Sequence, residues 1–398
     1  MRTFLAMRIA YLALIEIDVA NACLVHTREI AEGLAALGHD VTLILPRPLR
    51  KQSWLGIRHV WVRWWSFDRV GEWAFCVESA WRLWRLHRRH RFDLLYVREM
   101  ARHPFLPALV RWLRLPLFVE VNGWVLDDLR LLGVSGEELR AAEGCQRNLF
   151  GAAIGIVASA IGNAENIVTY YGIPKQGVYA QELGTNTAHF TPGDRRRVRT
   201  DLGLPLDGQI ILFAGSFHPD HDLSTLVNAF AQLVAQGFET VRLLLVGDGH
   251  QWEAIQRSVA SSGITGSVIM AGFCPYEKIP LYFQAADIAV VPLRAGRIKR
   301  QNGAVTLKLW DYMAAGLPVV VTDLPDTPSA SLLAGKAYVV PPEDATAMAE
   351  AFADLLGNVD KRIRLAQAGL NYVRQHRTWR QAAAETADFI AKRLKEIP

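Results

Sequence analysis

The chain has 398 residues, of which 51% are hydrophobic and 21% charged. This length exceeds what one hydrophobic core usually supports, and the composition excludes intrinsic disorder, so two folded domains are expected. The net charge of +5 and the pI near 9.0 are mild for this length and argue against a nucleic-acid-binding protein.

The first half of the chain alternates apolar strands with amphipathic helices. Its first apolar run is interrupted by Arg8, Glu16 and Asp18 before it reaches membrane-spanning length, so a strand and no transmembrane helix is predicted there. A helix is predicted over 24–37, ending at Gly38, where the helix end favours a positive φ. The predicted strands cover residues 8–15, 40–45, 94–97, 117–121 and 154–158.

A tryptophan-rich basic stretch at 81–91, together with 111–115, holds much of the positive charge. Two interpretations remain open for it. It fits a patch that docks on an anionic membrane, and it also fits helices with an apolar inner face and a solvated basic outer face.

The second half repeats the strand and helix alternation after a break at 184–207, which is the predicted linker. A helix is predicted over 223–236, and the segment from 360 onward is predicted to be helical, with Trp379 as an isolated large anchor. The predicted strands cover residues 210–214, 242–246, 268–271, 288–291 and 319–322. This pattern predicts a second parallel α/β domain.

Four cysteines are scattered along the chain without CxxC spacing or a nearby histidine cluster: Cys23, Cys76, Cys145 and Cys274. This spacing argues against a disulfide framework and against a zinc site. It fits a reduced, cytoplasmic compartment.

Two glycines follow predicted strands of the second half. Gly215 allows a sharp turn into a helix whose N-terminal amides suit a phosphate, although an ordinary strand-to-helix turn explains it equally well. Gly247 lies at the end of the next strand, where open α/β sheets bind ligands. The third glycine of a dinucleotide fingerprint is missing there, so an oxidoreductase is weakly supported.

The segment 306–323 is more specific. A helix is predicted to open near Thr306 and to place Lys308 and Asp311, three residues apart, on one face. A lysine beside a pyrophosphate and a carboxylate that accepts two ribose hydroxyls would form a nucleoside-diphosphate cradle. A surface ion pair on an amphipathic helix is the alternative.

Together with the motifs above, four further parts of the chain resemble the GT4 family of retaining glycosyltransferases (group 1): residues 25–41, 184–192, 272–280 and Trp379. The resemblance implies the α/β GT-B fold, with two doubly wound, Rossmann-like parallel-sheet domains facing a cleft and a C-terminal helix that crosses back to the first domain. It implies an acceptor-binding domain over 1–190 plus about 376–398, and a donor-binding domain over 191–375.

By this resemblance, Asp311 holds the donor ribose and Lys308 cradles the diphosphate at the helix start. The segment with Phe273 resembles the loop that reads the nucleobase. The implied donor-binding residues are Gly215, Ser216, His221, Gly247, Phe273, Thr306, Leu307, Lys308 and Asp311.

Three positions depart from the family pattern. Ser216 stands where an arginine is common, His221 where a lysine is common, and Gly303 where a glutamate is common. His221 can still donate a hydrogen bond to a diphosphate, and Lys299 or Arg300 are candidates for the missing charge.

On the acceptor side, Asn122 lies where many relatives present a histidine to the donor sugar. An amide cannot act as a base, and Glu120 is the nearest ionisable group. Arg98 and His26 are further candidates for lining the site, and each of these residues alone fits a structural role equally well.

The expected reaction is retaining transfer of a hexose-type sugar from a nucleoside-diphosphate sugar, UDP or GDP, to a sugar or lipid-linked acceptor. No cofactor and no metal are expected, because no DxD-type carboxylate pair stands out. The expected role is in cell-surface polysaccharide or glycolipid synthesis. The protein is expected in the cytoplasm, peripherally at the inner face of the plasma membrane.

Two alternatives remain. A catalytically silent GT-B scaffold or partner subunit is favoured by Ser216 and Gly303, and Lys308 and Asp311 count against it. A sugar-nucleotide epimerase would need a carboxylate pair that is not recognisable here.

Overall fold

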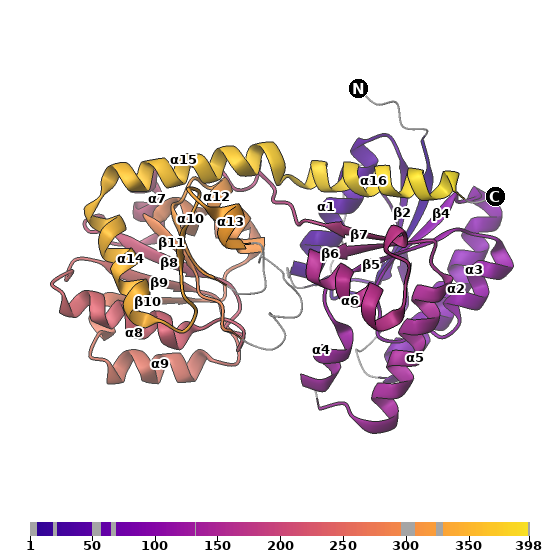
Figure 1. Cartoon of the computed structure of the whole chain (residues 1–398), viewed down its shortest axis with the longest axis horizontal. Coiled ribbons are helices and arrows are strands. Elements are labelled where there is room, and N and C mark those ends of the chain that lie inside the picture. The colour runs from indigo at the N-terminus through magenta and orange to yellow at the C-terminus, as the bar shows by residue number, and fades with distance from the viewer. Residues whose placement is uncertain are drawn as a thin grey trace. The chain divides into compact units, whose positions relative to one another are not determined.

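The computed structural model describes residues 6–18, 22–49, 57–64, 69–131, 133–295, 307–323 and 329–396. The chain forms two compact units (Figure 1). Unit 1 combines Met1–Leu183 with Trp379–Pro398, and unit 2 is Gly184–Thr378.

Unit 1 is built on a parallel sheet in the order β3-β2-β1-β4-β5-β6-β7. The central strands are almost wholly buried because helices cover both faces of the sheet. The strands are β1 (Arg8–Leu12), β2 (Asp40–Pro46), β3 (Arg58–Val62), β4 (Leu94–Arg98), β5 (Leu117–Val121), β6 (Gly155–Ser159) and β7 (Val178–Gln181).

The helices of unit 1 bury apolar residues on the sheet. One face is covered by helices α2, α3, α5 and α6, which contribute Phe75, Val110, Phe150 and Ile167 to the core. Helix α16 packs against α1, β6 and β7. The helices are α1 (Ala22–Ala36), α2 (Arg69–His90), α3 (Leu106–Leu113), α4 (Val125–Leu131), α5 (Gly136–Ala152), α6 (Ile161–Tyr171), η1 (Lys175–Gly177) and α16 (Trp379–Lys395).

Unit 2 contains a second parallel sheet in the order β10-β9-β8-β11-β12-β13. Alternate residues of its strands enter different cores, as Leu212 and Phe213 of β8 do. The strands are β8 (Ile210–Ala214), β9 (Arg242–Val246), β10 (Val268–Gly272), β11 (Ile288–Val291), β12 (Val319–Thr322) and β13 (Tyr338–Val340).

Helices pack on both faces of the unit 2 sheet. Helices α8, α9 and α14 contribute Phe230, Ile255 and Phe352 to one core, and α12 contributes Trp310 to the other. The helices are α7 (Arg195–Leu202), α8 (Leu223–Ala235), α9 (Trp252–Ser261), η2 (Thr265–Ser267), η3 (Tyr276–Lys278), α10 (Ile279–Ala285), α12 (Leu307–Ala314), α13 (Ser329–Leu333), α14 (Ala345–Gly357) and α15 (Val359–His376).

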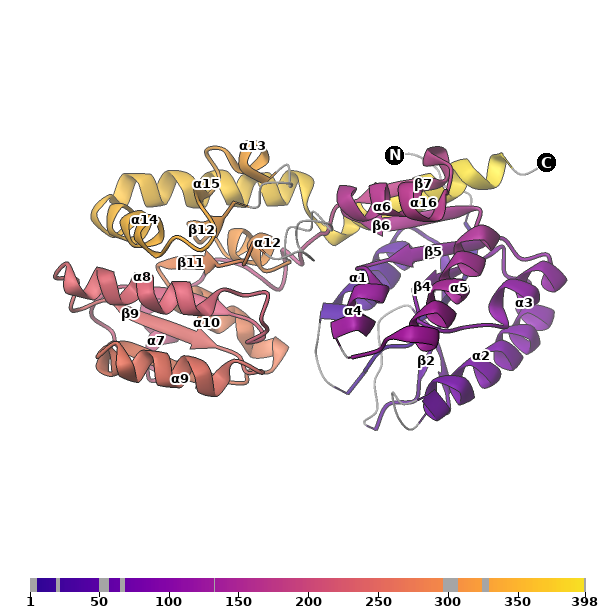
Figure 2. The same cartoon turned by 60° about the horizontal axis from the view of Figure 1, so that its bottom comes forward.

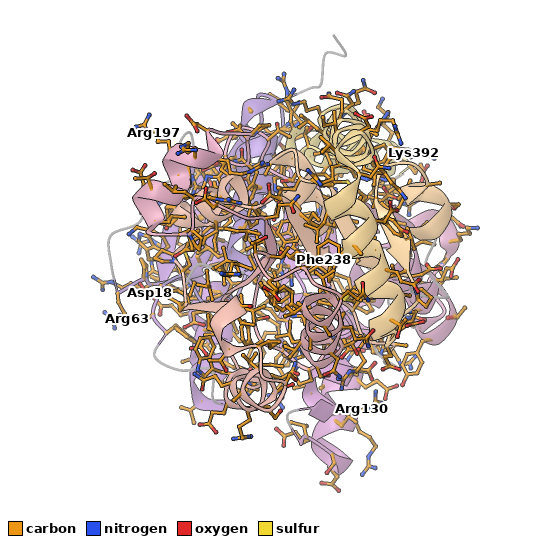
Figure 3. The ribbon with its side chains drawn as sticks, turned by 90° about the vertical axis from the view of Figure 1, so that its left-hand side faces the viewer. Asp18, Arg63, Arg130, Arg197, Phe238 and Lys392 are labelled. Carbon is orange, nitrogen blue, oxygen red and sulfur yellow. The ribbon has the colours of Figure 1, made fainter. Side chains whose placement is uncertain are left out.

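The segment predicted as a linker contains helix α7, which belongs to unit 2. Its arginines differ in environment: Arg197 projects outward with 80% of its side chain exposed (Figure 3), whereas Arg199 is buried and contacts Asp287 at 2.7 Å. Burial of Arg199 is compensated because its guanidinium also donates to the carbonyls of Ala285 and Gly208.

The first predicted strand is shorter than expected, because β1 ends at Leu12 rather than at residue 15. The predicted helix end at Gly38 is confirmed by its φ of 93°. Trp379 is the first residue of α16, and its buried ring lies 5.0 Å from that of His26 on α1. The predicted anchor therefore joins two helices within unit 1.

Candidate functional site

Two glycines of unit 2 bring the carboxyl ends of β8 and β9 close together. Gly215 has φ 154° and Gly247 has φ 131°, a region that other residues rarely adopt. A Cβ added at Gly247 would lie 1.9 Å from the carbonyl oxygen of Gly215. A Cβ at Gly215 would lie 2.6 Å from Nζ of Lys308. Both positions therefore need glycine, and the gap beside Gly215 is filled by a cation.

Lys308 and His221 meet at this point. Nζ of Lys308 lies 2.6 Å from Nε2 of His221, and Nδ1 of His221 lies 2.7 Å from the carbonyl oxygen of Ser216. The ammonium also lies 4.9 Å from the centre of the Phe213 ring. Lys308 comes from α12 and the other residues from β8 and the loop after it, so two segments far apart in sequence supply one basic cluster.

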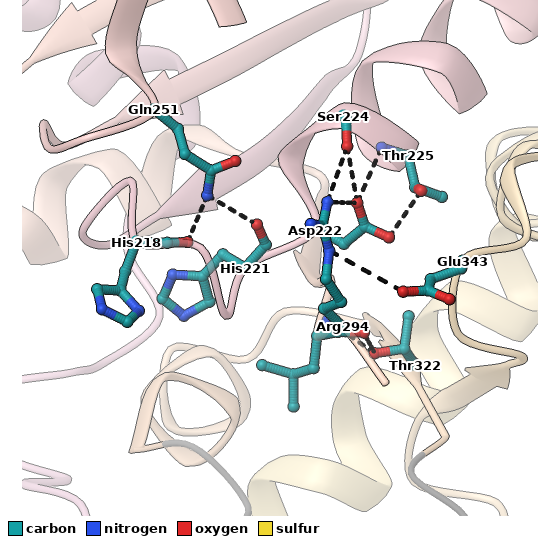
Figure 4. A network of polar contacts seen from close by, with 10 residues as sticks. His218, His221, Asp222, Ser224, Thr225, Gln251, Arg294, Thr322 and Glu343 are labelled. Carbon is teal, nitrogen blue, oxygen red and sulfur yellow. Dashed lines mark hydrogen bonds and ion pairs between the residues drawn. The ribbon is translucent and has the colours of Figure 1, made fainter. Parts of the chain in front are cut away.

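The loop that carries His221 is held at both ends. Asp222 caps α8 by accepting from the backbone N–H of Thr225, and it contacts Arg294 at 3.1 Å (Figure 4). Gln251 donates its side-chain amide to the carbonyls of His218 and His221 (Figure 4). The loop is therefore shaped by polar contacts and not by its glycine alone.

The charge of Asp222 is maintained by its neighbours. Burial opposes ionisation, but hydrogen bonds from Thr225, Ser224 and Arg294 hold the pKa of Asp222 below its usual value. The carboxylate therefore stays ionised at the start of α8, where the helix dipole favours a negative charge.

Helix α12 also presents Asp311, one turn after Lys308. Asp311 accepts a hydrogen bond from the hydroxyl of Thr185 within unit 2. The neighbouring Tyr312 fastens the helix to β8, because its buried hydroxyl accepts from the N–H of Ala214 at 2.7 Å and donates to the same residue's carbonyl. Lys308 and Asp311 are thus positioned by a buried anchor.

The remaining predicted donor-side residues differ in how they are placed. Leu307 is the first residue of α12 and is half-buried. Phe273 follows β10 at the carboxyl end of the sheet, with 64% of the residue exposed. Thr306, Gly303, Lys299 and Arg300 lie outside the described residues.

In unit 1, the four predicted acceptor-side residues form one cluster around the carboxylate of Glu120. This residue lies in β5 and is 1% exposed. Arg98, from the end of β4, donates to Oε1 at 3.0 Å, and Nε2 of His26 lies 3.6 Å from the same oxygen. The side-chain amide of Asn122 also donates to Oε1. The sheet register explains the grouping, since Arg98 and Glu120 are paired positions on adjacent strands.

Sequence reasoning missed Tyr11, which completes this cluster. Its buried hydroxyl donates to Oε2 of Glu120 at 2.8 Å. Its ring packs edge-on against that of Tyr96 at 4.9 Å. A tyrosine in the middle of an apolar strand is itself a signal, because a buried phenol needs a hydrogen-bond partner.

The electrostatics of the cluster argue against Glu120 as a general base. Burial alone would raise its pKa, but Arg98 and the donors Asn122 and Tyr11 hold the pKa of Glu120 below its usual value, and His26 adds to this only when its imidazole is protonated. Burial lowers the pKa of His26 to about 4, so this imidazole is neutral at pH 7. Glu120 is an ionised, hydrogen-bonded anchor, and Asn122 is the more accessible residue of the pair.

In the described ranges, no group of three or more histidine, cysteine, aspartate or glutamate side chains is placed to hold a metal ion. Within the same ranges, no helix combines the length and the apolar character needed to cross a bilayer.

Two family models match the chain. The "Glycosyl transferase 4-like domain" matches residues 22–178, and "Glycosyl transferases group 1" matches residues 208–358. A protein of Catenulispora acidiphila named D-inositol 3-phosphate glycosyltransferase 2 is 27% identical over 355 residues, which is 83% of this chain and 78% of that protein. Together the two family models cover about three quarters of the sequence.

Solved structures share the fold over nearly the whole chain. A sucrose-phosphate synthase from Thermosynechococcus elongatus superposes with a TM-score of 0.76 at 18% identity, covering 97% of this chain and 98% of that one. The Anabaena protein HepE in complex with UDP-glucose gives a TM-score of 0.72 at 15% identity, covering 96% and 99%. These likenesses, with the two parallel-sheet units, confirm the predicted GT-B fold.

Proposed function

Because the chain belongs to the GT4-type group 1 glycosyltransferases, we propose that it moves a hexose-type sugar from a nucleoside-diphosphate sugar to an acceptor hydroxyl with retention of configuration. The observation that carries this proposal is the pair formed by Lys308 and His221, 2.6 Å apart, beside the glycines at the carboxyl ends of β8 and β9. UDP or GDP is the proposed nucleotide, and the UDP-glucose complex of the structurally similar HepE supports UDP.

The donor diphosphate would be held by cationic and backbone donors in unit 2. Lys308 donates to phosphate oxygens, and His221 adds a second donor beside it. Asp311, which accepts from Thr185 in this structure, would accept ribose hydroxyls in its place. As the bond to the anomeric carbon breaks, negative charge grows on the leaving diphosphate, and fixed donors stabilise that charge without reorganising.

Metal independence remains part of the proposal. Lys308 can supply positive charge at the diphosphate where other transferases use a divalent cation. We expect sugar transfer in the presence of a chelator, and a requirement for Mg²⁺ or Mn²⁺ would contradict this part.

On the acceptor side, Asn122 is the proposed contact to a sugar hydroxyl. Its amide donates to Glu120, while its buried Oδ1 has no hydrogen-bond partner among the described residues. A substrate hydroxyl that donates to this oxygen would satisfy it. Glu120 acts through Asn122 as a positioning residue and not as a base.

The test is nucleotide binding by isothermal calorimetry and thermal shift, with UDP, GDP, ADP and dTDP. Wild type should bind one base preferentially, and Asp311→Ala and Lys308→Met should each weaken binding about tenfold or more, since each removes a charged hydrogen bond. Lys361→Met is the matched control, because Lys361 also lies in unit 2 over an aromatic ring, that of Tyr338.

The outcomes separate the alternatives. Binding lost in both site variants and kept in the control supports the proposed donor site. A folded protein that binds none of the four nucleotides would favour the silent scaffold. Release of UDP or GDP from the matching sugar nucleotide, with the product anomer read by NMR, tests the transfer and its stereochemistry.

An exposed apolar face on unit 1 supports peripheral contact between this protein and a membrane, which would give it access to a lipid-linked acceptor. Helix α2 exposes residues spaced three or four apart, which lie on one side of a helix, and α3 packs beside it (Figure 2). We call the following set the aromatic face: Val70, Trp73, Val77, Trp81, Phe105 and Trp112. Trp112 is the most exposed of its tryptophans, at 68%.

The charge next to the aromatic face indicates an anionic bilayer as its partner. Arg85 lies over the ring of Trp81 at 5.4 Å, and Arg88 over that of Trp84 at 5.3 Å. The last turn of α2 is wholly basic. Tryptophan at the headgroup level combined with arginine near anionic lipid is the composition of an interfacial helix.

Vesicle co-sedimentation tests this contact. Wild type should bind vesicles that contain phosphatidylglycerol and not pure phosphatidylcholine, and Trp81→Ser with Trp112→Ser should abolish binding. Ile363→Ser, at an exposed apolar position of α15, is the control. Absence of binding to anionic vesicles would refute membrane docking and leave a protein partner as the occupant of the face.

A further inference from the structure

The hydrogen-bond chain through His221 defines where its proton lies. Nδ1 is 2.7 Å from the Ser216 carbonyl oxygen, which can only accept, so Nδ1 carries the hydrogen. Nε2 is 2.6 Å from the Lys308 ammonium, which can only donate, so Nε2 accepts. In this arrangement His221 is therefore the neutral Nδ1–H tautomer.

The groups around His221 favour this neutral form. Among the described residues, Lys308 of α12 is a cation in direct contact with His221. On its own loop, His218 contacts Asp220 at 3.3 Å, and Asp222 is engaged with the α8 N-terminus and with Arg294, which follows β11. The two carboxylates of this loop, Asp220 and Asp222, thus have other partners, while an imidazolium at His221 would place two cations 2.6 Å apart.

A bound diphosphate changes both contacts of Nε2. The phosphate oxygens accept the hydrogens that Lys308 now gives to His221, which releases Nε2. The negative charge of the ligand favours a proton on Nε2, which then donates to a phosphate oxygen. Nδ1–H continues to donate to Ser216, so the ring keeps its orientation throughout.

We propose that His221 takes up a proton when a nucleoside diphosphate binds, so that the protein binds its donor more tightly in mild acid. This inference rests on the proposed function, because it concerns the same site. It assigns His221 a role that a lysine in its place could not have, since a lysine is charged with or without the ligand.

The direction of the effect follows from linkage. If the ligand-bound protein binds one more proton than the free protein, affinity rises as pH falls, by up to about tenfold per pH unit. The window lies around neutral pH, because histidine ordinarily titrates near pH 6.5. Above this window both states are neutral at His221, and affinity no longer changes with pH.

Calorimetry measures this proton uptake directly. UDP-glucose and GDP-mannose are suitable probes, because their phosphates are both esterified and do not titrate between pH 6 and 8. Titrations at several pH values in two buffers of different ionisation enthalpy give the protons taken up per ligand. Wild type should take up between about half and one proton near pH 7 and bind several-fold more tightly at pH 6 than at pH 7.5.

Three variants make the test specific. His221→Lys should bind the sugar nucleotide with no proton uptake, and His221→Gln should bind weakly and without pH dependence. His218→Gln, at the neighbouring histidine, should keep the wild-type uptake. Equal proton uptake by wild type and His221→Lys would overturn the inference while leaving the donor site intact. No binding by wild type or His221→Lys at any pH would instead overturn the proposed function.

Discussion

Two buried histidines should make unit 1 sensitive to mild acid. His26 and His103 are 3% and 4% exposed, and burial lowers the pKa of each to about 4. In the unfolded chain each would titrate near 6.5, so the unfolded state binds protons at a higher pH than the folded state does. Stability therefore falls as pH drops from about 6.5 toward 4, and is fully present above that window.

The magnitude follows from the pKa difference. Over the whole window, each histidine lowers the free energy of unfolding by about 3 kcal/mol. At pH 5, about 2 kcal/mol of this has been lost for each histidine. Two sites together cost about 4 kcal/mol at pH 5. For a unit of this size, that corresponds to a Tm roughly 8–16 °C lower than at pH 7.5. Glu120 adds nothing to this window, because its pKa is lowered and its contribution is lost only at lower pH.

The assay compares the Tm at pH 7.5 and pH 5 for wild type, His26→Gln and His103→Gln. Each substitution should remove about 4–8 °C of the difference, whatever its effect at pH 7.5. Some slope should persist, since burial also lowers the pKa of His39. His250→Gln, at an exposed position, is the control. An unchanged pH 7.5 to pH 5 difference in both variants would show that neither histidine is held neutral by burial.

Three further substitutions test packing described above. Gly247→Ala, whose Cβ would meet the Gly215 carbonyl at 1.9 Å, should abolish nucleotide-induced thermal shifts while circular dichroism stays native. Arg199→Met should destabilise unit 2 by about 3–5 kcal/mol in urea, because Asp287 loses a buried partner; a loss below 1 kcal/mol would contradict the buried pair. Gly33 lies in α1 where that helix packs on α16, and an added Cβ would lie 2.5 Å from Cβ of Ala383, so Gly33→Leu should cost about 1–3 kcal/mol in the same assay; a neutral result would mean that the two helices can move apart without cost.

The interior strands of both sheets could be predicted because each is a short, continuous apolar run. The predicted bounds of β5, β8, β9, β11 and β12 agree with the structure to the residue. The strands that were missed, β3, β7 and β13, all lie at sheet edges. The strands β3 and β7 mix polar and apolar residues, and β13 is only three residues long, so each lacks the continuous apolar run on which the prediction depended.

Parts of the candidate site were also predictable from position alone. Gly215, Lys308 and Asp311 follow strands or open helices, and local sequence rules place such residues at the carboxyl edge of a sheet. The contact between Lys308 and His221, 87 residues apart, depends on how α12 packs on β8 and has no local signature. Tyr11 was overlooked because its partner Glu120 lies 109 residues away, although the buried phenol required one.

Helix α16 imposes an order on synthesis at the ribosome. It completes unit 1, where Trp379 and Ile390 are buried and Gln181 donates to the carbonyl of Ala382, yet the whole of unit 2 precedes it in the chain. Unit 2 can therefore fold while the nascent chain is still growing. Residues 1–183 cannot complete the fold of unit 1 until α16 has been synthesised. A nascent chain stalled before residue 379 would expose the apolar side of α1 and recruit chaperones, and a separately expressed fragment 1–183 would regain native protection of α1 only when residues 379–398 are supplied in trans.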